Sequence, residues 1–214
     1  MARTRAALIR AAAEEFGRGG YAGTSVRRIT QTAEVSTGAL TFHFESKSDL
    51  ADAVVSEALT VVEAAVADAL AGVGTPLERL SAVVAGVLRA AHRSTAVRSA
   101  ALLEQEHPQG EVRWSRVWHP VVLRLAEESR AVGELPPGVS PEEVSALAAL
   151  FLRSAGVRPP HRDGGPEPLP PGPEAPAADL DRTLRLWDIA RRGLLPAPCD
   201  DPPPREPATV PAPR

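Results

Sequence analysis

A short stretch of the chain gathers residue types that bind phosphate. Ser25, Ser36 and Thr37 stand at or next to predicted helix N-termini. Free backbone N–H groups and the helix dipole favour negative charge at such positions. Gly38 and Ala39 follow with almost no side chain, so the helix that carries them can approach another surface closely. The pattern indicates a helix that lies deep in a groove with phosphates along its edges.

Longer polar side chains flank this cluster. Arg28 can project toward the same side, and Thr41 and His43 can donate hydrogen bonds to a phosphate or to the edge of a base. Lys47 is the only lysine in the chain and can pair with a backbone phosphate. Thr24, at the start of a predicted helix, completes the set of expected contacts.

Each position also has a purely structural interpretation. Ser36 can act only as an N-cap, His43 can favour the dipole at the end of its helix, and Lys47 can be an ordinary solvated lysine. Phe42 and Phe44 are expected in the core, where they would hold the short helix to its neighbours.

Helical periodicity predicts the elements that position these residues. Apolar residues from Ala6 to Phe16 recur at helical spacing, and three glycines then end the helix. Thr24 is a plausible N-cap of a second helix, Ser36 of a third and Ser46 of a fourth. Two short helices joined by a tight turn after a longer one form a helix-turn-helix. The predicted spans of the last three helices are 25–33, 37–42 and 47–70.

The rest of the chain is also predicted to be helical, which makes the fold class all-α. No segment alternates convincingly between apolar and polar residues as a strand does. We expect a helix-turn-helix domain at 1–46, a helical ligand-binding and dimerisation domain at 47–195 with a flexible loop at 157–178, and a disordered Pro-rich tail at 196–214. The further helices are predicted at 76–91, 96–106, 114–132, 141–155 and 180–194.

Charge and cysteine content narrow the class of protein. The net charge is −3, but residues 1–50 hold seven basic and five acidic groups, which leaves a mildly basic head of +2 on a body of −5. Cys199 is the single cysteine, so no disulfide can form within one chain, as suits a cytoplasmic protein. No apolar segment is long enough for a membrane span, and the N-terminus lacks the apolar segment of a signal peptide.

No catalytic, metal or cofactor site is expected. The chain has no Gly-rich phosphate loop, no Gly-x-Ser-x-Gly elbow and no histidine or cysteine cluster with metal-ligand spacing. Its five histidines are scattered along the sequence. An enzyme is therefore the weaker alternative, and turnover of a bound compound would distinguish it.

Residues 3–55 resemble the DNA-binding domain of the TetR family of transcriptional repressors. The resemblance rests on Phe16, on Gly20-Tyr21, on the Thr-Ser start of the second helix and on three later runs. It implies that the short helix at 37–42 is the recognition helix. The family usually has a phosphate-contacting tyrosine at the position of Thr41, so one contact is shortened or lost. The three runs are Val35-Ser36-x-Gly38, Phe42-His43-Phe44 and Ser46-Lys47-x-x-Leu50.

A narrower resemblance concerns the γ-butyrolactone receptors of antibiotic-producing actinobacteria and their pseudo-receptor relatives. The motif GALTFHF is similar to theirs. It implies a tryptophan in the ligand pocket, in the helix before a turn like Gly133-Glu134-Leu135. Trp118 fits that position better than Trp114, with Phe151 as a further candidate; all three can instead be core residues. The family also implies a homodimer formed by the helices at about 141–156 and 180–194.

These observations together predict a ligand-responsive repressor. A homodimer is expected to bind a pseudo-palindromic operator in double-stranded DNA through two recognition helices. A small hydrophobic molecule, such as a γ-butyrolactone or an antibiotic, would release it from genes of antibiotic biosynthesis or efflux. The alternative is a DNA-binding regulator with no small-molecule response, which would use the same residue types in a fully packed core.

Overall fold

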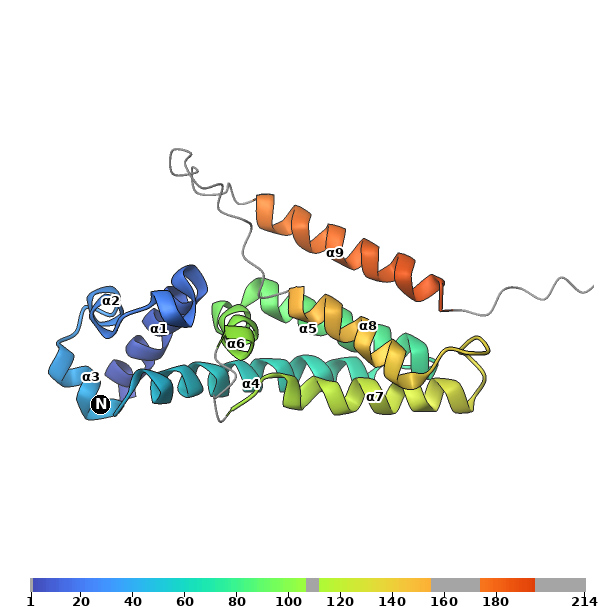
Figure 1. Cartoon of the computed structure of the whole chain (residues 1–214), viewed down its shortest axis with the longest axis horizontal. Helices are drawn as coiled ribbons and strands as arrows, with labels where there is room; N and C mark the ends of the chain where they lie inside the picture. Colours follow the sequence, from blue (N-terminus) through green and yellow to red (C-terminus); the bar gives the residue numbers. More distant parts are fainter. Residues whose placement is uncertain (1, 107–111, 155–173, 195–214) are drawn as a thin grey trace, which may run out of the picture.

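The computed structural model describes residues 2–106, 112–154 and 174–194. Within these ranges the chain forms nine α-helices and no strand, so the prediction of an all-α fold is confirmed (Figure 1). The helices are α1 (Ala2–Gly23), α2 (Val26–Thr32), α3 (Thr37–His43), α4 (Lys47–Ala71), α5 (Pro76–Arg93), α6 (Thr95–Glu106), α7 (Ser115–Ala131), α8 (Pro141–Ser154) and α9 (Glu174–Arg192).

The helices gather at two ends of the long helix α4. Helices α1, α2 and α3 lie together at its N-terminal end, and we call them the head (Figure 1). Helices α5 and α7 pack along the rest of α4, α8 packs on α7, and α9 lies on α5. Helix α6 is packed against both α1 and α4, so it lies between the head and the other helices. The head therefore rests on two helices, α4 and α6.

Side-chain caps explain where α2, α3 and α4 begin. Ser36 accepts a hydrogen bond from the backbone N–H of Ala39, and Ser46 forms a capping box with Asp49. Both predicted N-caps are thus confirmed. The prediction that Thr24 caps α2 is wrong, because the neighbouring Ser25 occupies that position and accepts from the N–H of Arg28.

Glycine ends the regular part of α1. Gly20 has a φ of 68°, which a residue with a side chain rarely adopts, and the helix is kinked there. The carboxylate of Glu106 on α6 occupies the space where a Cβ of Gly20 would lie. It also accepts a hydrogen bond from the backbone N–H of Tyr21 at 2.8 Å. The end of α6 is therefore bound to the last turn of α1, within the head.

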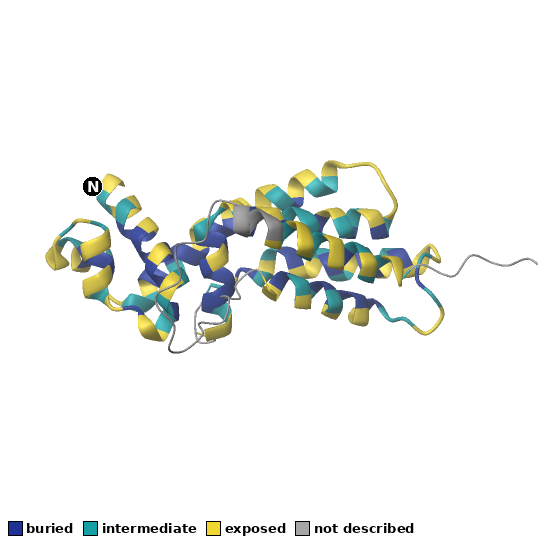
Figure 2. Cartoon of the chain, turned by 90° about the horizontal axis from the view of Figure 1, so that it is seen from above, coloured by how far each residue is buried: buried dark blue, intermediate teal, exposed yellow. Residues whose placement is uncertain are grey.

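The two phenylalanines that flank His43 have opposite environments. Phe44 is buried, as predicted, but Phe42 has 68 % of its surface exposed, so its expected core role is wrong. The reason is the helical repeat. Leu40 in α3 and Phe44, the residue that caps α3, are four positions apart and both buried, whereas Phe42 lies on the opposite side of the helix from Leu40. Figure 2 shows the exposed residues of the head gathered on its outer end.

The C-terminal third departs from its predicted boundaries. Residues 174–178 are expected to lie in a loop, but helix α9 begins at Glu174, so these residues are helical. The rest of the predicted loop, 157–173, and the predicted tail lie outside the described residues. In the described part of the chain, no helix is long and apolar enough to cross a membrane.

Candidate functional site

The outer surface of α3 is open and contains little side-chain bulk at its centre. Thr37, Gly38, Thr41 and Phe42 are all exposed. A Cβ added to Gly38 would meet only the Ser36 hydroxyl oxygen, at 3.9 Å, and the glycine needs no unusual φ. The fold therefore does not require glycine here, although glycine destabilises a helix by about 1 kcal/mol relative to alanine. With Gly38 at this point, the outer surface of α3 is open to a close approach.

The polar groups of α3 are partly used within the helix. The Ser36 hydroxyl accepts from the N–H of Ala39 at 3.1 Å, and the Thr41 hydroxyl donates to the carbonyl of Gly38 at 3.1 Å. His43 is half-buried, and its ring lies edge-on to the exposed Phe42 at 5.2 Å between centroids. Ser36 thus does act as an N-cap, the structural interpretation offered above.

A buried carboxylate in α1 holds the arginine of α2. Glu15 is only 3 % exposed, and one of its carboxylate oxygens lies 2.9 Å from Nε of Arg28. The other oxygen accepts from Arg18 and from the Thr32 hydroxyl, both at 2.9 Å. The Arg28 side chain remains about half exposed. Its guanidinium is therefore held by Glu15 on one side and open to solvent on the other. The sequence analysis missed Glu15, because an acidic residue beside Phe16 gives no sign of burial.

Lys47 joins the start of α4 to the end of α1. Its ammonium donates to the carbonyls of Tyr21 at 2.9 Å and Thr24 at 3.1 Å, and lies 4.2 Å from the centre of the Tyr21 ring. Lys47 is therefore more than a solvated surface lysine. An ammonium has three N–H donors, so a third can serve another acceptor.

The two hydroxyl residues between α1 and α2 are placed differently. Thr24 is buried, and its hydroxyl lies 2.7 Å from the carbonyl of Gly20 and 2.8 Å from that of Glu15. Its side chain does not stand on the outer surface where the sequence analysis expected a contact. Ser25 is exposed at the N-terminus of α2, close to Arg28 in sequence and space.

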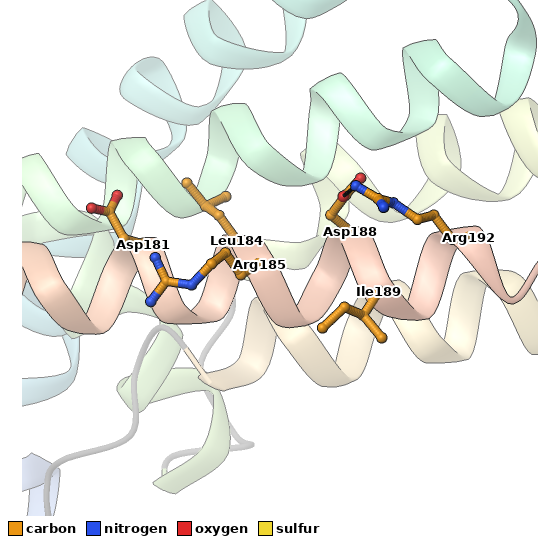
Figure 3. A pocket seen from close by; sticks show the side chains of 6 residues that line it. All are labelled: Asp181, Leu184, Arg185, Asp188, Ile189 and Arg192. Atoms are coloured by element: carbon orange, nitrogen blue, oxygen red, sulfur yellow. Dashed lines mark hydrogen bonds and ion pairs between the residues drawn. The ribbon is translucent and has the colours of Figure 1, made fainter.

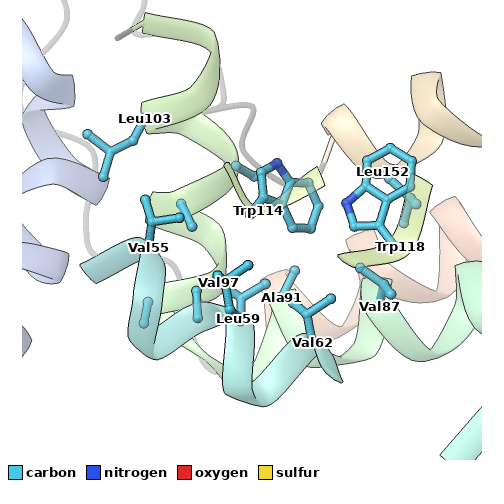
Figure 4. Close-up of a cluster of buried hydrophobic side chains, with 14 of the residues drawn as sticks. Val55, Leu59, Val62, Val87, Ala91, Val97, Leu103, Trp114, Trp118 and Leu152 are labelled. Carbon is cyan, nitrogen blue, oxygen red and sulfur yellow. The ribbon is translucent and has the colours of Figure 1, made fainter. Parts of the chain in front are cut away.

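Two tryptophans lie in the core between α4, α5, α6 and α8. Trp114 and Trp118 are 1 % and 2 % exposed, with ring centroids 5.6 Å apart (Figure 4). The indole N–H of Trp118 is buried without a hydrogen-bond partner among the described residues, and so is the Ser145 hydroxyl of α8. An unpaired buried donor costs about 1–3 kcal/mol. Phe151, by contrast, packs edge-on against Trp187 of α9, at 5.3 Å. All three predicted ligand residues thus belong to one hydrophobic core, in which Trp114 contacts Trp118 and Phe151 contacts Trp187.

The end of α6 connects this core to the head. Glu104 accepts hydrogen bonds from the hydroxyl of Ser115 at 2.6 Å and from its backbone N–H at 3.1 Å, at the start of α7 and next to Trp114. Two residues later on α6, Glu106 accepts from the N–H of Tyr21. The contacts of α6 with the start of α7 and with the head thus lie within three consecutive residues.

Helix α9 presents a shallow groove to solvent, which the sequence analysis did not anticipate. Trp187 is buried on its inner side and donates to the Ser81 hydroxyl of α5 at 2.8 Å. The outer side carries Ile189, which is 66 % exposed (Figure 3). Asp188 forms ion pairs with Arg191 and Arg192, and these hydrogen bonds lower the pKa of its carboxyl. The groove is lined by Asp181, Leu184, Arg185, Asp188, Ile189 and Arg192.

Across residues 2–106, 112–154 and 174–194, no three histidine, cysteine or acidic side chains come together as a metal ion would need.

Solved structures share this architecture. The TetR family protein CprB from S. coelicolor A3(2) matches with a TM-score of 0.68 and 25 % identity, over 91 % of this chain and 90 % of that one. A gamma-butyrolactone receptor (ArpA-like protein) matches with a TM-score of 0.67 and 24 % identity, over 91 % of this chain and 89 % of that one. At 24 % identity, the match to the gamma-butyrolactone receptor shows only that the two proteins share a fold.

Sequence comparison identifies the family. Residues 8–54 match the pattern described as bacterial regulatory proteins, tetR family. The A-factor receptor protein of Streptomyces griseus is 28 % identical, over 63 % of this chain but only 47 % of its own length. The HTH-type transcriptional regulator BetI of Burkholderia thailandensis is 32 % identical, over 69 % of this chain and 77 % of its own length. The chain thus belongs to the tetR family of bacterial regulatory proteins, and it is a DNA-binding transcriptional regulator rather than an enzyme.

Proposed function

We propose that the protein is a ligand-responsive repressor. Its homodimer binds a pseudo-palindromic operator. It leaves the operator when a small hydrophobic molecule, such as a γ-butyrolactone or an antibiotic, binds in the domain formed by residues 47–195. The controlled genes would be those of antibiotic biosynthesis or efflux. The observation that carries the ligand response is the buried Trp118 N–H without a described partner, because such a group gains a hydrogen bond when a ligand with an acceptor binds. The likeness to the A-factor receptor protein gives further support.

The proposed DNA surface is the outer face of α3 with its neighbours. Gly38 allows the backbone of α3 to approach the floor of the major groove, and Thr41 and His43 flank it. Arg28, held by Glu15, and the third N–H of Lys47 would contact phosphates. Thr24 is left out of this set because it is buried. The remaining members are Ser25, Ser36 and Thr37.

Phe42 adds an apolar contact to this surface. A ring that is 68 % exposed gains nothing for the fold of a single chain. Beside Gly38 and Thr41, it can pack against the C5 methyl of thymine, which projects into the major groove. We therefore include Phe42 among the residues that distinguish one operator sequence from another.

The proposed division of labour follows the helices. Residues 1–46 would form the DNA-binding domain, and 47–195 the domain that binds ligand and forms the dimer. A ligand shifts the equilibrium only if it binds one conformation of the body better than the other. A series of contacts leads from Trp114 and its neighbour Ser115 to Glu104, and from there along α6 to Glu106 and Tyr21. We propose that a change of conformation around the ligand reaches the head by this route.

A gel-shift titration tests the proposal. The full-length protein is titrated against its own upstream region, with and without an organic extract of the producing culture. We expect a specific shift that the extract reverses. A shift that no extract affects would favour the alternative, a regulator without small-molecule response. No shift on this DNA or on any sequence chosen from a random pool would overturn DNA binding through this surface.

A further inference from the structure

Two uncharged side chains among the described residues have a buried polar atom without a hydrogen-bond partner. They are Trp118 of α7 and Ser145 of α8, which are 2 % and 3 % exposed. Burial of such a group is unfavourable, because the group loses its hydrogen bonds to water and gains none in return. The indole N–H of Trp118 belongs to the proposed ligand site, whereas no contact within the described residues accounts for the hydroxyl of Ser145.

A second buried serine shows that this core can satisfy a hydroxyl. Ser129 of α7 is fully buried, and its hydroxyl donates to the carbonyl of Leu125, one turn earlier in the same helix, at 2.8 Å. Ser145 lies in the second turn of α8, where a carbonyl also precedes it by one turn, but its hydroxyl makes no such bond. The Ser145 hydroxyl is therefore available to a group from outside the chain.

Trp118 and Ser145 lie toward opposite ends of the pair of helices that carries them. Helices α7 and α8 pack on each other and run antiparallel, because residues 132–140 join them as a turn (Figure 1). Trp118 precedes the end of α7, at Ala131, by 13 residues, and Ser145 follows the start of α8, at Pro141, by four residues. Along the pair they are therefore about nine residues apart, or roughly 13 Å at about 1.5 Å per residue.

The core between these two groups is apolar. The buried residues of α7 and α8 at intermediate positions are Val122, Leu125, Ala148 and Leu152. A molecule that reaches from Trp118 to Ser145 would thus contact mainly hydrocarbon along its length, with a polar partner at each end.

A third unpaired donor lies at the same end of the core as Ser145. Arg79, near the start of α5, is 4.0 Å from Glu128, near the end of α7. Its Nε is buried and has no hydrogen-bond partner among the described residues. A guanidinium can only donate hydrogen bonds, and a serine hydroxyl can donate one. This end of the core therefore favours an oxygen acceptor, as the N–H of Trp118 does at the other end.

We propose that the Ser145 hydroxyl donates to a second oxygen of the ligand, roughly 13 Å from the oxygen that accepts from Trp118. The inference rests on the proposed function and specifies its ligand class: an elongated, mainly apolar molecule with an oxygen acceptor near each end. An alkyl γ-butyrolactone whose oxygens all lie in its ring would pair with only one of the two groups. The other would stay unpaired, which is how a polar site discriminates against an analogue that lacks one polar group.

Stability in the absence of any ligand tests whether Ser145 is unpaired. Ser145→Ala removes a buried hydroxyl that has no partner, so the Tm of the full chain should rise by about 2–4 °C. Ser129→Ala is the matched control, because it removes a buried hydroxyl that is paired, and its Tm should stay the same or fall. If the Tm of Ser145→Ala does not rise, the hydroxyl is already paired in the folded chain and the inference is overturned.

Release from DNA tests the contact itself. In a gel shift with an organic extract of the producing culture, Ser145→Ala should need about three- to tenfold more extract for half-release than the parent chain. Ser129→Ala should need no more than the parent. In the double variant Ser145→Ala/Trp118→Phe the two fold-changes should multiply, because contacts this far apart act independently.

The outcomes separate this inference from the proposed function. Release of Ser145→Ala at the parent's extract concentration would overturn the inference and leave a ligand-responsive repressor intact. A parent chain that no extract releases would overturn the ligand response, and the inference with it. Tandem mass spectrometry of the compound that the parent retains from the extract tests the ligand class. Oxygens near both ends would support the inference, and oxygens at one end only would overturn it.

Discussion

Nε of Arg28 lies 2.9 Å from a carboxylate oxygen of Glu15, so an arginine of the proposed DNA surface is positioned by a buried acid of another helix. Variants of these two residues can therefore separate the effect of the charge of Arg28 from the effect of its position. Arg28→Ala removes both the charge and the contact. Glu15→Gln leaves the charge on Arg28 but loosens its hold, because an amide binds guanidinium more weakly than a carboxylate does.

We expect different salt dependences from these two variants. Arg28→Ala should weaken operator binding and reduce the slope of log K against log salt by about one unit, the value for one lost phosphate contact. Glu15→Gln should weaken binding with a smaller change of slope. Fluorescence anisotropy over a salt series measures both. Arg89→Ala, exposed on α5, is the control; an Arg28 variant that behaves like it would remove Arg28 from the surface.

Gly38→Ala should make the protein more stable and less able to bind DNA. Nothing in the fold crowds a Cβ at this position, and alanine favours a helix over glycine by about 1 kcal/mol. For a chain of this size, that corresponds to a rise in Tm of about 2–4 °C. We expect operator affinity to fall at least about tenfold. Thermal unfolding and anisotropy measure the two effects, and unchanged affinity would exclude close approach at Gly38.

Phe42→Ala should change DNA binding without changing stability. The side chain is mostly exposed, so the free energy of unfolding should stay within about 0.5 kcal/mol of the parent value. Phe44→Ala, at a buried position, should cost about 3–5 kcal/mol and serves as the contrast. Operators in which single thymines are replaced by uracil, which lacks the methyl group, locate the contact. If every replacement changes the operator affinity of the parent and of Phe42→Ala by the same factor, Phe42 does not contact a thymine methyl.

Trp118→Phe should uncouple the ligand from DNA while leaving DNA binding intact. The substitution keeps an aromatic ring in the core but removes the N–H that lacks a described partner. Loss of one hydrogen bond of about 1–1.5 kcal/mol would raise the extract concentration for half-release up to about tenfold. Trp114→Phe is the matched variant one turn away and should release normally. Equal release curves for the parent and both variants would make Trp118 an ordinary core residue.

Local signals made the helix starts of the head predictable. Ser36 and Ser46 cap their helices through hydrogen bonds to residues three positions later, so the relevant information lies within one turn of sequence. Thr24 and Ser25 could not be told apart in this way, because both are hydroxyl residues. Which one caps α2 depends on where the kink at Gly20 leaves the chain, and on the carbonyls that bury Thr24.

Contacts between distant segments could not be predicted. Phe42 lies in the seven-residue helix α3 and Phe44 caps its end, and packing against other helices determines which of the two rings is buried. Arg18 lies only three positions from Glu15, but Arg28 and Thr32, which also surround Glu15, come from another helix that nothing near Glu15 in the sequence indicates. The tie from Glu106 to Tyr21 spans 85 positions. Residues that hold or move the proposed site were therefore missed more often than those on its surface.

Helix α4 converts small rotations into large displacements. It runs without interruption for 25 residues, which is about 37 Å at 1.5 Å per residue. Its first residue, Lys47, is bound to the head, and its later turns are packed among α5 and α7. A tilt of about 5° around its far end would move Lys47 by roughly 3 Å, the length of one hydrogen bond. Under the proposed ligand response, a shift of a fraction of an ångström beside the far end of α4 would therefore become a displacement of ångströms at the proposed DNA contacts.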